Sequence, residues 1–139
     1  MKKSAIAVAL PIGLLLTGCA ASTPEPAATP SAPAQVEVRY EVDFEAAHKG
    51  LTSKTPSADI TVSTPTGTVQ KTVDLPMKTK DGQTGVRGDA PAGSPLYISA
   101  QKNDAYGSIT CRIYSSGELI SENTSSGDYS IATCKGTAR

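Results

Sequence analysis

One of the three cysteines in this 139-residue chain stands where an acylation reaction would use its thiol. Cys19 directly follows Leu16-Thr17-Gly18, which closes a short apolar run. This order is typical of the bacterial lipobox, in which the thiol accepts a diacylglyceryl group and the cysteine becomes the first residue of the mature chain. We therefore predict lipidation of Cys19, with palmitate-like acyl chains. Two such chains are enough for stable membrane anchoring, whereas one gives marginal binding.

The segment before Cys19 has the layout of an export signal. Lys2 and Lys3 form a positively charged start, and Ala5 to Leu16 is an apolar stretch of 12 residues. A membrane-spanning helix needs about 20 apolar residues, so this stretch favours a cleaved signal peptide over residues 1–18. The mature chain is then held by lipid on the outer side of the cell membrane, in the cell envelope. The alternative is an ordinary secretory signal followed by a chance cysteine.

The other two cysteines, Cys111 and Cys134, are predicted to form a disulfide. Two thiols in one small exported domain usually pair, and lipidation of Cys19 leaves no cysteine over. The loop closed by this bond has about 24 residues, which in the chain-entropy account stabilises the fold by about 3.5 kcal/mol. A metal site is the alternative, but His48 is the sole histidine and a fourth ligand is missing.

No catalytic set is evident, and we predict that the protein is not an enzyme and holds no cofactor or metal. Serine and threonine are abundant, but a hydrolase needs a base, and His48 is expected on an exposed turn. Without Lys2 and Lys3 the chain has 11 basic and 13 acidic residues, a net charge of −2. Nucleic acid is therefore an unlikely partner for the mature protein.

Residues 19–34 read as a lipidated cysteine and a Pro/Ala-rich linker. Four prolines and no large apolar residue between Ala20 and Ala34 disfavour helix and packed strand. We expect an extended spacer that reaches on the order of 45 Å, at about 3.1 Å per residue. The spacer holds the folded part, residues 35–139, away from the membrane.

The folded part begins with a clear strand pattern. Over Val36–Glu45 apolar and charged residues alternate, which predicts a strand with one buried face. We interpret its acidic residues as a solvated face, not as a general-acid cluster, and expect Arg39 and Arg112 to pair with some of them. The carboxylates on this face are Glu37, Glu41, Asp43 and Glu45.

Turn signals recur every 8–12 residues through the rest of the chain, and we expect a loop over Gly88–Pro95. Seven to eight short, mostly antiparallel strands at this spacing predict an all-β fold, an immunoglobulin-like β-sandwich with one disulfide. The further strands are predicted over Ala58–Thr64, Thr68–Leu75, Leu96–Lys102, Ser108–Ser115, Glu118–Asn123 and Tyr129–Lys135.

The disulfide constrains how the last strands are arranged. In a flat three-stranded meander, the strands of Cys111 and Cys134 would lie about 9.5 Å apart, twice the spacing of neighbours. A disulfide tolerates a Cα separation of up to roughly 7 Å. The final strand is therefore expected to cross to the other sheet, or the segment between the two cysteines to lie off the sheet.

The C-terminal half resembles the MmpS family, actinobacterial membrane proteins whose extracytoplasmic β-sandwich accompanies MmpL transporters of the resistance-nodulation-division type. Upstream, Val38–Val42, Ala58–Val62 and Asp74-Leu75-Pro76 are similar to the family's first strands and its L-P-W segment. The family's order of residues is met at Ser99, Gln101, Gly107, Ile109, Cys111, Arg112, Ile113, Gly117, Gly127 and Cys134.

Two departures accompany this resemblance. Met77 stands where the family usually has tryptophan, and a lipobox replaces the usual transmembrane helix. The resemblance implies an accessory protein for an MmpL-like exporter of lipids, siderophores or drugs. The alternative is a free-standing lipoprotein that binds an apolar ligand, a glycan or a host surface. A cavity between the sheets favours the second function, and a packed core with a flat exposed face favours the first.

Overall fold

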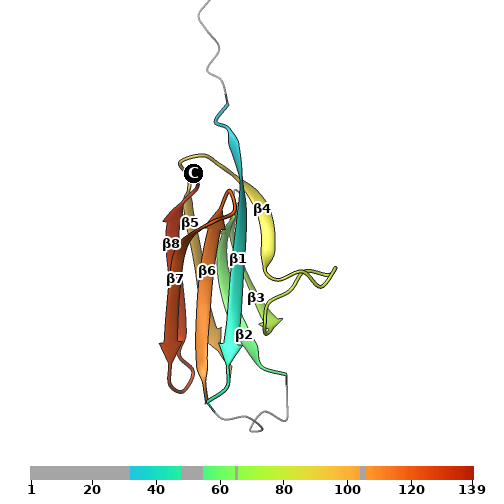
Figure 1. The fold of residues 1–139 in the computed structure, drawn as a ribbon, viewed down its shortest axis with the longest axis vertical. Helices are drawn as coiled ribbons and strands as arrows, with labels where there is room; N and C mark the ends of the chain where they lie inside the picture. Colours follow the sequence, from blue (N-terminus) through green and yellow to red (C-terminus); the bar gives the residue numbers. More distant parts are fainter. Residues whose placement is uncertain (1–31, 48–54, 65, 104–105) are drawn as a thin grey trace, which may run out of the picture. The chain divides into compact units, whose positions relative to one another are not determined.

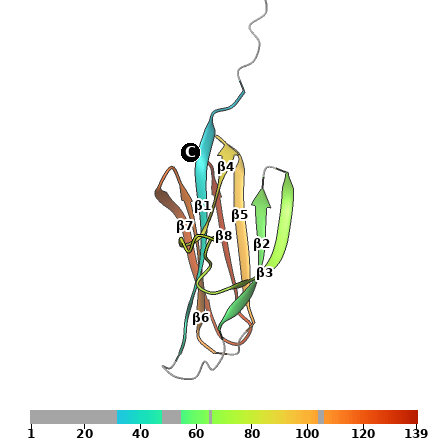
Figure 2. The ribbon, with the colours of Figure 1, turned by 90° about the vertical axis from the view of Figure 1, so that its right-hand side faces the viewer.

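A computed structural model of the protein describes residues 32–47, 55–64, 66–103 and 106–139. In these residues eight strands form two antiparallel sheets that pack face to face (Figures 1 and 2). Sheet A has the order β4-β1-β6-β7, and sheet B has the order β3-β2-β5-β8. The strands are β1 (Gln35–Glu45), β2 (Ser57–Thr64), β3 (Gly67–Asp74), β4 (Val86–Pro91), β5 (Pro95–Lys102), β6 (Ser108–Ser115), β7 (Glu118–Ser126) and β8 (Ile131–Thr137).

The predicted all-β sandwich with one disulfide is confirmed. Two connections, β2 to β3 and β6 to β7, are hairpins within a sheet, and every other connection changes sheets. The strand order differs from that of immunoglobulin constant domains, which pair their strands as A-B-E-D and C-F-G. Within the described residues, no helix is long and apolar enough to cross a membrane.

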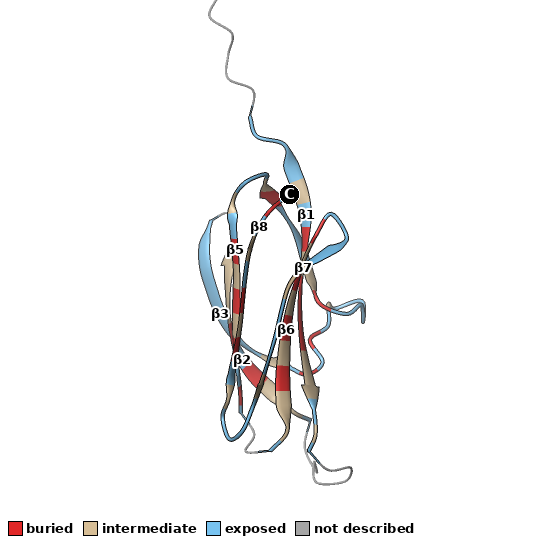
Figure 3. Cartoon of the chain, turned by 60° about the vertical axis from the view of Figure 1, so that its left-hand side comes forward, coloured by how far each residue is buried: buried red, intermediate tan, exposed pale blue. Residues whose placement is uncertain are grey.

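The core lies between the sheets and follows the predicted alternation. Every second residue of β5 and β6 is buried, and on β1 the inward residues Val38, Tyr40 and Val42 are buried (Figure 3). Aliphatic side chains dominate this core, as expected for a chain without tryptophan. The fully buried members include Ile60, Ile98, Ala100, Ile109, Cys111, Ile113, Ala132 and Cys134.

One predicted loop is partly a strand. The sequence analysis assigned Gly88–Pro95 to a loop, but β4 runs from Val86 to Pro91 and pairs along β1. Glycine and proline weaken strands by propensity, yet both are tolerated at a sheet edge, where one side of the strand needs no partner. β4 is such an edge strand of sheet A.

The acidic face of β1 is solvated at Glu37 and Glu45, but the prediction was wrong for Glu41, which is 6% exposed. The segment after β3 returns across this strand: Met77 N donates to the Val42 carbonyl at 2.9 Å, and Gly85 N to the Met77 carbonyl at 2.8 Å. A Cβ on Gly85 would lie 2.9 Å from Cγ of Glu41. The close approach of this segment therefore covers Glu41.

The expected ion pairs on this outer face are present. Arg39 pairs with Glu41 at 2.9 Å, and its guanidinium lies 3.9 Å from the ring centre of Tyr114. Arg112 pairs with Asp43 and, at 3.2 Å, with Glu122. Although burial opposes it, the two carboxylates raise the pKa of Arg112, which stays charged. Both arginines on this outer face are thus paired with carboxylates.

Candidate functional site

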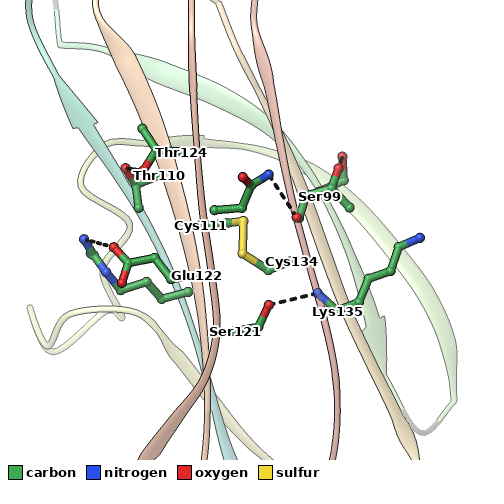
Figure 4. The surroundings of a disulfide bond; sticks show 11 residues. Ser99, Thr110, Cys111, Ser121, Glu122, Thr124, Cys134 and Lys135 are labelled. Carbon is green, nitrogen blue, oxygen red and sulfur yellow. Dashed lines mark hydrogen bonds and ion pairs between the residues drawn. A yellow bond between two sulfur atoms is a disulfide. The ribbon is translucent and has the colours of Figure 1, made fainter.

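The predicted disulfide joins the two sheets. Cys111 on β6 and Cys134 on β8 are bonded, with their Cα atoms 6.0 Å apart (Figure 4). β8 belongs to sheet B and β6 to sheet A, so the expected crossing of the final strand is confirmed. Both cysteines are at most 1% exposed. The disulfide is therefore buried between the sheets and is not accessible to solutes.

Hydrogen bonds close the sandwich on the same side. Lys135 N donates to the Ser121 hydroxyl at 3.3 Å, and Asn123 Nδ2 donates to the Thr133 carbonyl at 3.2 Å. These contacts tie β7 of sheet A to the edge of β8 in sheet B (Figure 4). We call the region formed by β6, β7 and β8 the disulfide side.

The opposite side of the sandwich holds a pocket of about 400 Å³, which we call the inter-sheet pocket. Its walls come from β1 and β4 of sheet A and from β2 and β5 of sheet B. This volume is within the range of about 300–1,000 Å³ that is usual for small-molecule sites. Its apolar lining residues are Val38, Val62, Val86, Ala90, Pro91, Pro95 and Leu96.

A glycine on the inner face of β4 leaves this space open. Gly88 lies directly opposite Val38 in the β1–β4 register and therefore shares its inward direction. A Cβ added at Gly88 would meet no atom within 4 Å. Glycine inside a strand often marks the close approach of a ligand or of another backbone. Gly88 therefore leaves open space at the β4 wall of the pocket.

Tyr40 supplies a polar group inside the pocket. Its hydroxyl donates to the Ser63 carbonyl at 3.4 Å, and the Ser63 hydroxyl accepts from Tyr97 N at 2.9 Å. Burial, partly offset by hydrogen bonds, raises the pKa of Tyr40 above its usual value near 10. The phenol is therefore neutral at physiological pH and adds no charge to the pocket.

Two charged residues, Arg87 and Asp89, also line the pocket, but the β1–β4 register gives them outward positions. Arg87 lies opposite Arg39 and Asp89 opposite Glu37, on the solvent face of sheet A. Arg87 forms an exposed ion pair with Glu37 at 3.0 Å. The other polar lining residues, Tyr40, Ser63, Thr64 and Ser94, carry neutral hydroxyls. A mostly apolar interior with neutral hydroxyls suits a hydrocarbon chain and disfavours an ion.

β3, the edge strand of sheet B on the pocket side, is largely exposed. In the described part of the chain it pairs only with β2, and all its residues except Val73 are exposed. Val69, which lies opposite the pocket residue Val62, is 45% exposed. Lys71 occupies the next inward position, where a charge discourages edge-to-edge pairing with another sheet. The inner face of β3 thus extends the apolar wall beyond the pocket.

Met77, noted in the sequence analysis as a departure from the resemblance, is 1% exposed and packs in the core. Its side chain is therefore not available to a partner.

Two predicted positions lie outside the described residues: Cys19 with its signal and most of the linker, and His48. Lipidation and export stay predictions. Among the described residues, no group of three or more His, Cys, Asp or Glu side chains is placed to hold a metal ion. Sequence reasoning missed the inter-sheet pocket, although Gly88 within an alternating stretch from Val86 to Ala90 was a usable signal.

No protein-family model matches this chain, and a search of curated proteins found no relative.

Proposed function

We propose that this protein is a lipid-anchored module of the cell envelope that binds an apolar chain in the inter-sheet pocket. The pocket itself is the observation that supports this function. Between the two functions left open by the sequence, a cavity between the sheets favours a binding module over a docking platform with a packed core. The predicted lipid on Cys19 supports a place of action at the membrane.

The walls and the polarity of the pocket define the ligand class. Aliphatic side chains from both sheets line it, and the hydroxyls of the lining residues Tyr40, Thr64 and Ser94 are already bonded to backbone carbonyls. Burial of hydrocarbon against such walls contributes roughly 25 cal/mol per Å² of apolar surface removed from water. A saturated or polyene acyl chain gains from this burial along its whole length, whereas a glycan would leave its hydroxyls without partners.

A fluorescent fatty acid tests the proposal. The chain carrying Cys19→Ser, secreted so that no acyl group is attached, is titrated with cis-parinaric acid in detergent-free buffer. We expect saturable one-to-one binding. Gly88→Leu places a side chain in the open space of the pocket and should weaken binding by about tenfold or more, equivalent to about 1.4 kcal/mol.

Gln70→Leu is the matched control, because it adds the same side chain to an exposed position of β3 outside the pocket. It should leave the affinity unchanged. Equal binding by the Gly88→Leu variant and the parent would show that the probe sits elsewhere and would overturn the proposal. Urea unfolding of both variants checks that they are folded, so that a loss of affinity is not caused by unfolding.

The accessory role beside an MmpL-like exporter is a second proposal. It is supported by the resemblance around Cys111 and Cys134, which the disulfide now joins across the sheets. A pull-down with the tagged lipoprotein from its own membranes tests it. Recovery of a transporter supports the role, and a preparation free of any transporter counts against it.

A further inference from the structure

The chain enters the domain beside the inter-sheet pocket. The carbonyl of Ala34, at the end of the linker, accepts a hydrogen bond from Ala92 N at 2.8 Å. The next residue, Gln35, pairs with Pro91, which lines the pocket. The junction between linker and domain is thus one residue away from the pocket wall.

The other end of the sandwich is far from this junction. β1 runs from Gln35 to Glu45, a length of about 36 Å at about 3.3 Å per residue. Glu45 pairs with Ser108, which in turn pairs with Ser126 at the β7–β8 turn. Figure 1 shows the start of β1 and the C terminus at one end and this turn at the opposite end. The pocket therefore lies in the half of the domain that carries the linker.

We propose that the inter-sheet pocket receives an acyl chain of a phospholipid from the membrane to which the protein is anchored. This inference rests on the proposed function and names its ligand. Because the linker joins the domain at the pocket end, this end can reach the bilayer while the domain stays tethered to it. Restricting a site to the neighbourhood of its ligand raises the effective concentration, which falls towards zero when a linker cannot span the distance.

The shape of the open side supports the same occupant. The exposed β3, with Val69 on its inner face, continues the apolar wall from the pocket towards solvent. An acyl chain that is only partly withdrawn from the bilayer can lie along this wall while the head group of the lipid stays outside the pocket. Charged residues flank this route: Arg87 and Asp89 line the pocket from outward positions of β4, and Lys71 is the next inward residue after Val69 on β3.

Photo-crosslinking on vesicles tests the inference. The chain with Cys19→Ser receives one new cysteine, either Ala34→Cys at the linker junction or Asp128→Cys in the β7–β8 turn, and is coupled to a maleimide phospholipid. Both positions are exposed, and the disulfide-bonded cysteines are buried and do not compete. The vesicles contain phosphatidylglycerol and phosphatidylethanolamine with a trace of phosphatidylethanolamine that carries a diazirine in its acyl chain.

After irradiation, peptide mass spectrometry should find the lipid on β1 and β4 when the anchor is at position 34. Gly88→Leu in the same protein should reduce this labelling about tenfold, in parallel with its loss of affinity. Anchoring at position 128 should reduce it strongly, because the pocket residue Val38 is seven residues from Glu45 along β1, about 23 Å, and a short linker keeps the pocket at that distance from the surface. Equal labelling from both anchors would overturn the inference.

A parallel arm separates the two proposals. A free diazirine fatty acid is offered to the unanchored protein in solution. If it labels the pocket while the vesicle lipid does not, the membrane-lipid inference fails and the binding function stands. If neither probe labels β1 and β4, both proposals fail.

Discussion

Two glycines on inward-facing strand positions show how differently the two sides of this sandwich are packed. Gly136 on β8 lies opposite the buried Leu96, and a Cβ there would lie 2.7 Å from Cδ1 of Ile120. Gly88 on β4 lies opposite the buried Val38, and a Cβ there would meet nothing within 4 Å. The same residue type therefore serves close packing on the disulfide side and an open space on the pocket side.

This difference follows from how the sheets are fastened. The disulfide side has the covalent bond between β6 and β8 and the hydrogen bonds of Ser121 and Asn123 to the β8 backbone. On the pocket side, β1 and β4 of sheet A lie across the pocket from β2 and β5 of sheet B, and the edge strand β3 is exposed. A sandwich fixed along one side can keep a pocket on the other without losing the register of its strands.

Removing the disulfide should have the largest effect on stability. The double variant Cys111→Ala and Cys134→Ala avoids a lone thiol and should lower the free energy of unfolding by about 3.5 kcal/mol, because the unfolded chain loses the constraint of a 24-residue loop. Urea unfolding at pH 7 measures this change. A loss below about 1 kcal/mol would mean that the hydrogen bonds and packing of β7 and β8, not the covalent bond, hold this side together.

The two glycines should respond differently to alanine. Gly88→Ala should raise the free energy of unfolding by about 0.5–1 kcal/mol, since the added methyl group restricts the unfolded chain and meets no clash. Gly136→Ala should raise it by less than Gly88→Ala does, because the end of the Ile120 side chain must move away from the new methyl group. Chemical denaturation of both variants gives the comparison. An equal or larger gain for Gly136→Ala would contradict the contrast between packed and open sides.

The features of the fold that could be predicted from the sequence are those that residues close together in the chain encode, or that a single distance limit fixes. Alternation over Val36–Glu45 identified β1, and recurring turn signals separated the strands that follow, such as β2 and β3. The reach of a disulfide was enough to place the final strand in the other sheet. Each of these inferences needed a local pattern or one distance limit, and each is confirmed.

The site depends on contacts between residues far apart in the sequence. Gly88 opens the pocket because it faces Val38, which is 50 residues earlier and on the neighbouring strand, so local composition near Gly88 indicated a loop. Glu41 is buried because the segment around Gly85 crosses it, which alternation along β1 does not encode. Lys102 is likewise fully buried and donates to the Gly107 carbonyl at 2.8 Å. Pairing across strands, not propensity within them, decides these features.

The smallest predicted effect is on the pH dependence of stability, to which the pocket residue Tyr40 contributes. Because burial raises the pKa of Tyr40, the folded state holds the phenolic proton more tightly than the unfolded state does. Its contribution is therefore fully present below pH 10 and is lost as the pH rises through 10 and above. Tyr40→Phe should lower the free energy of unfolding by at most about 1 kcal/mol at pH 7 and should make the decline of stability above pH 10 shallower.

Tyr114 on the outer face gives a second contribution to this decline. Burial and then the charge of Glu41 also raise the pKa of Tyr114, so Tyr114→Phe should independently reduce the remaining slope of stability against pH. Ligand in the pocket should steepen the slope of the parent and of Tyr114→Phe but not that of Tyr40→Phe, since the ligand buries Tyr40 further. Urea unfolding between pH 8 and 11, with and without the fatty acid, measures these slopes, and a ligand effect that survives in Tyr40→Phe would place the ligand outside the inter-sheet pocket.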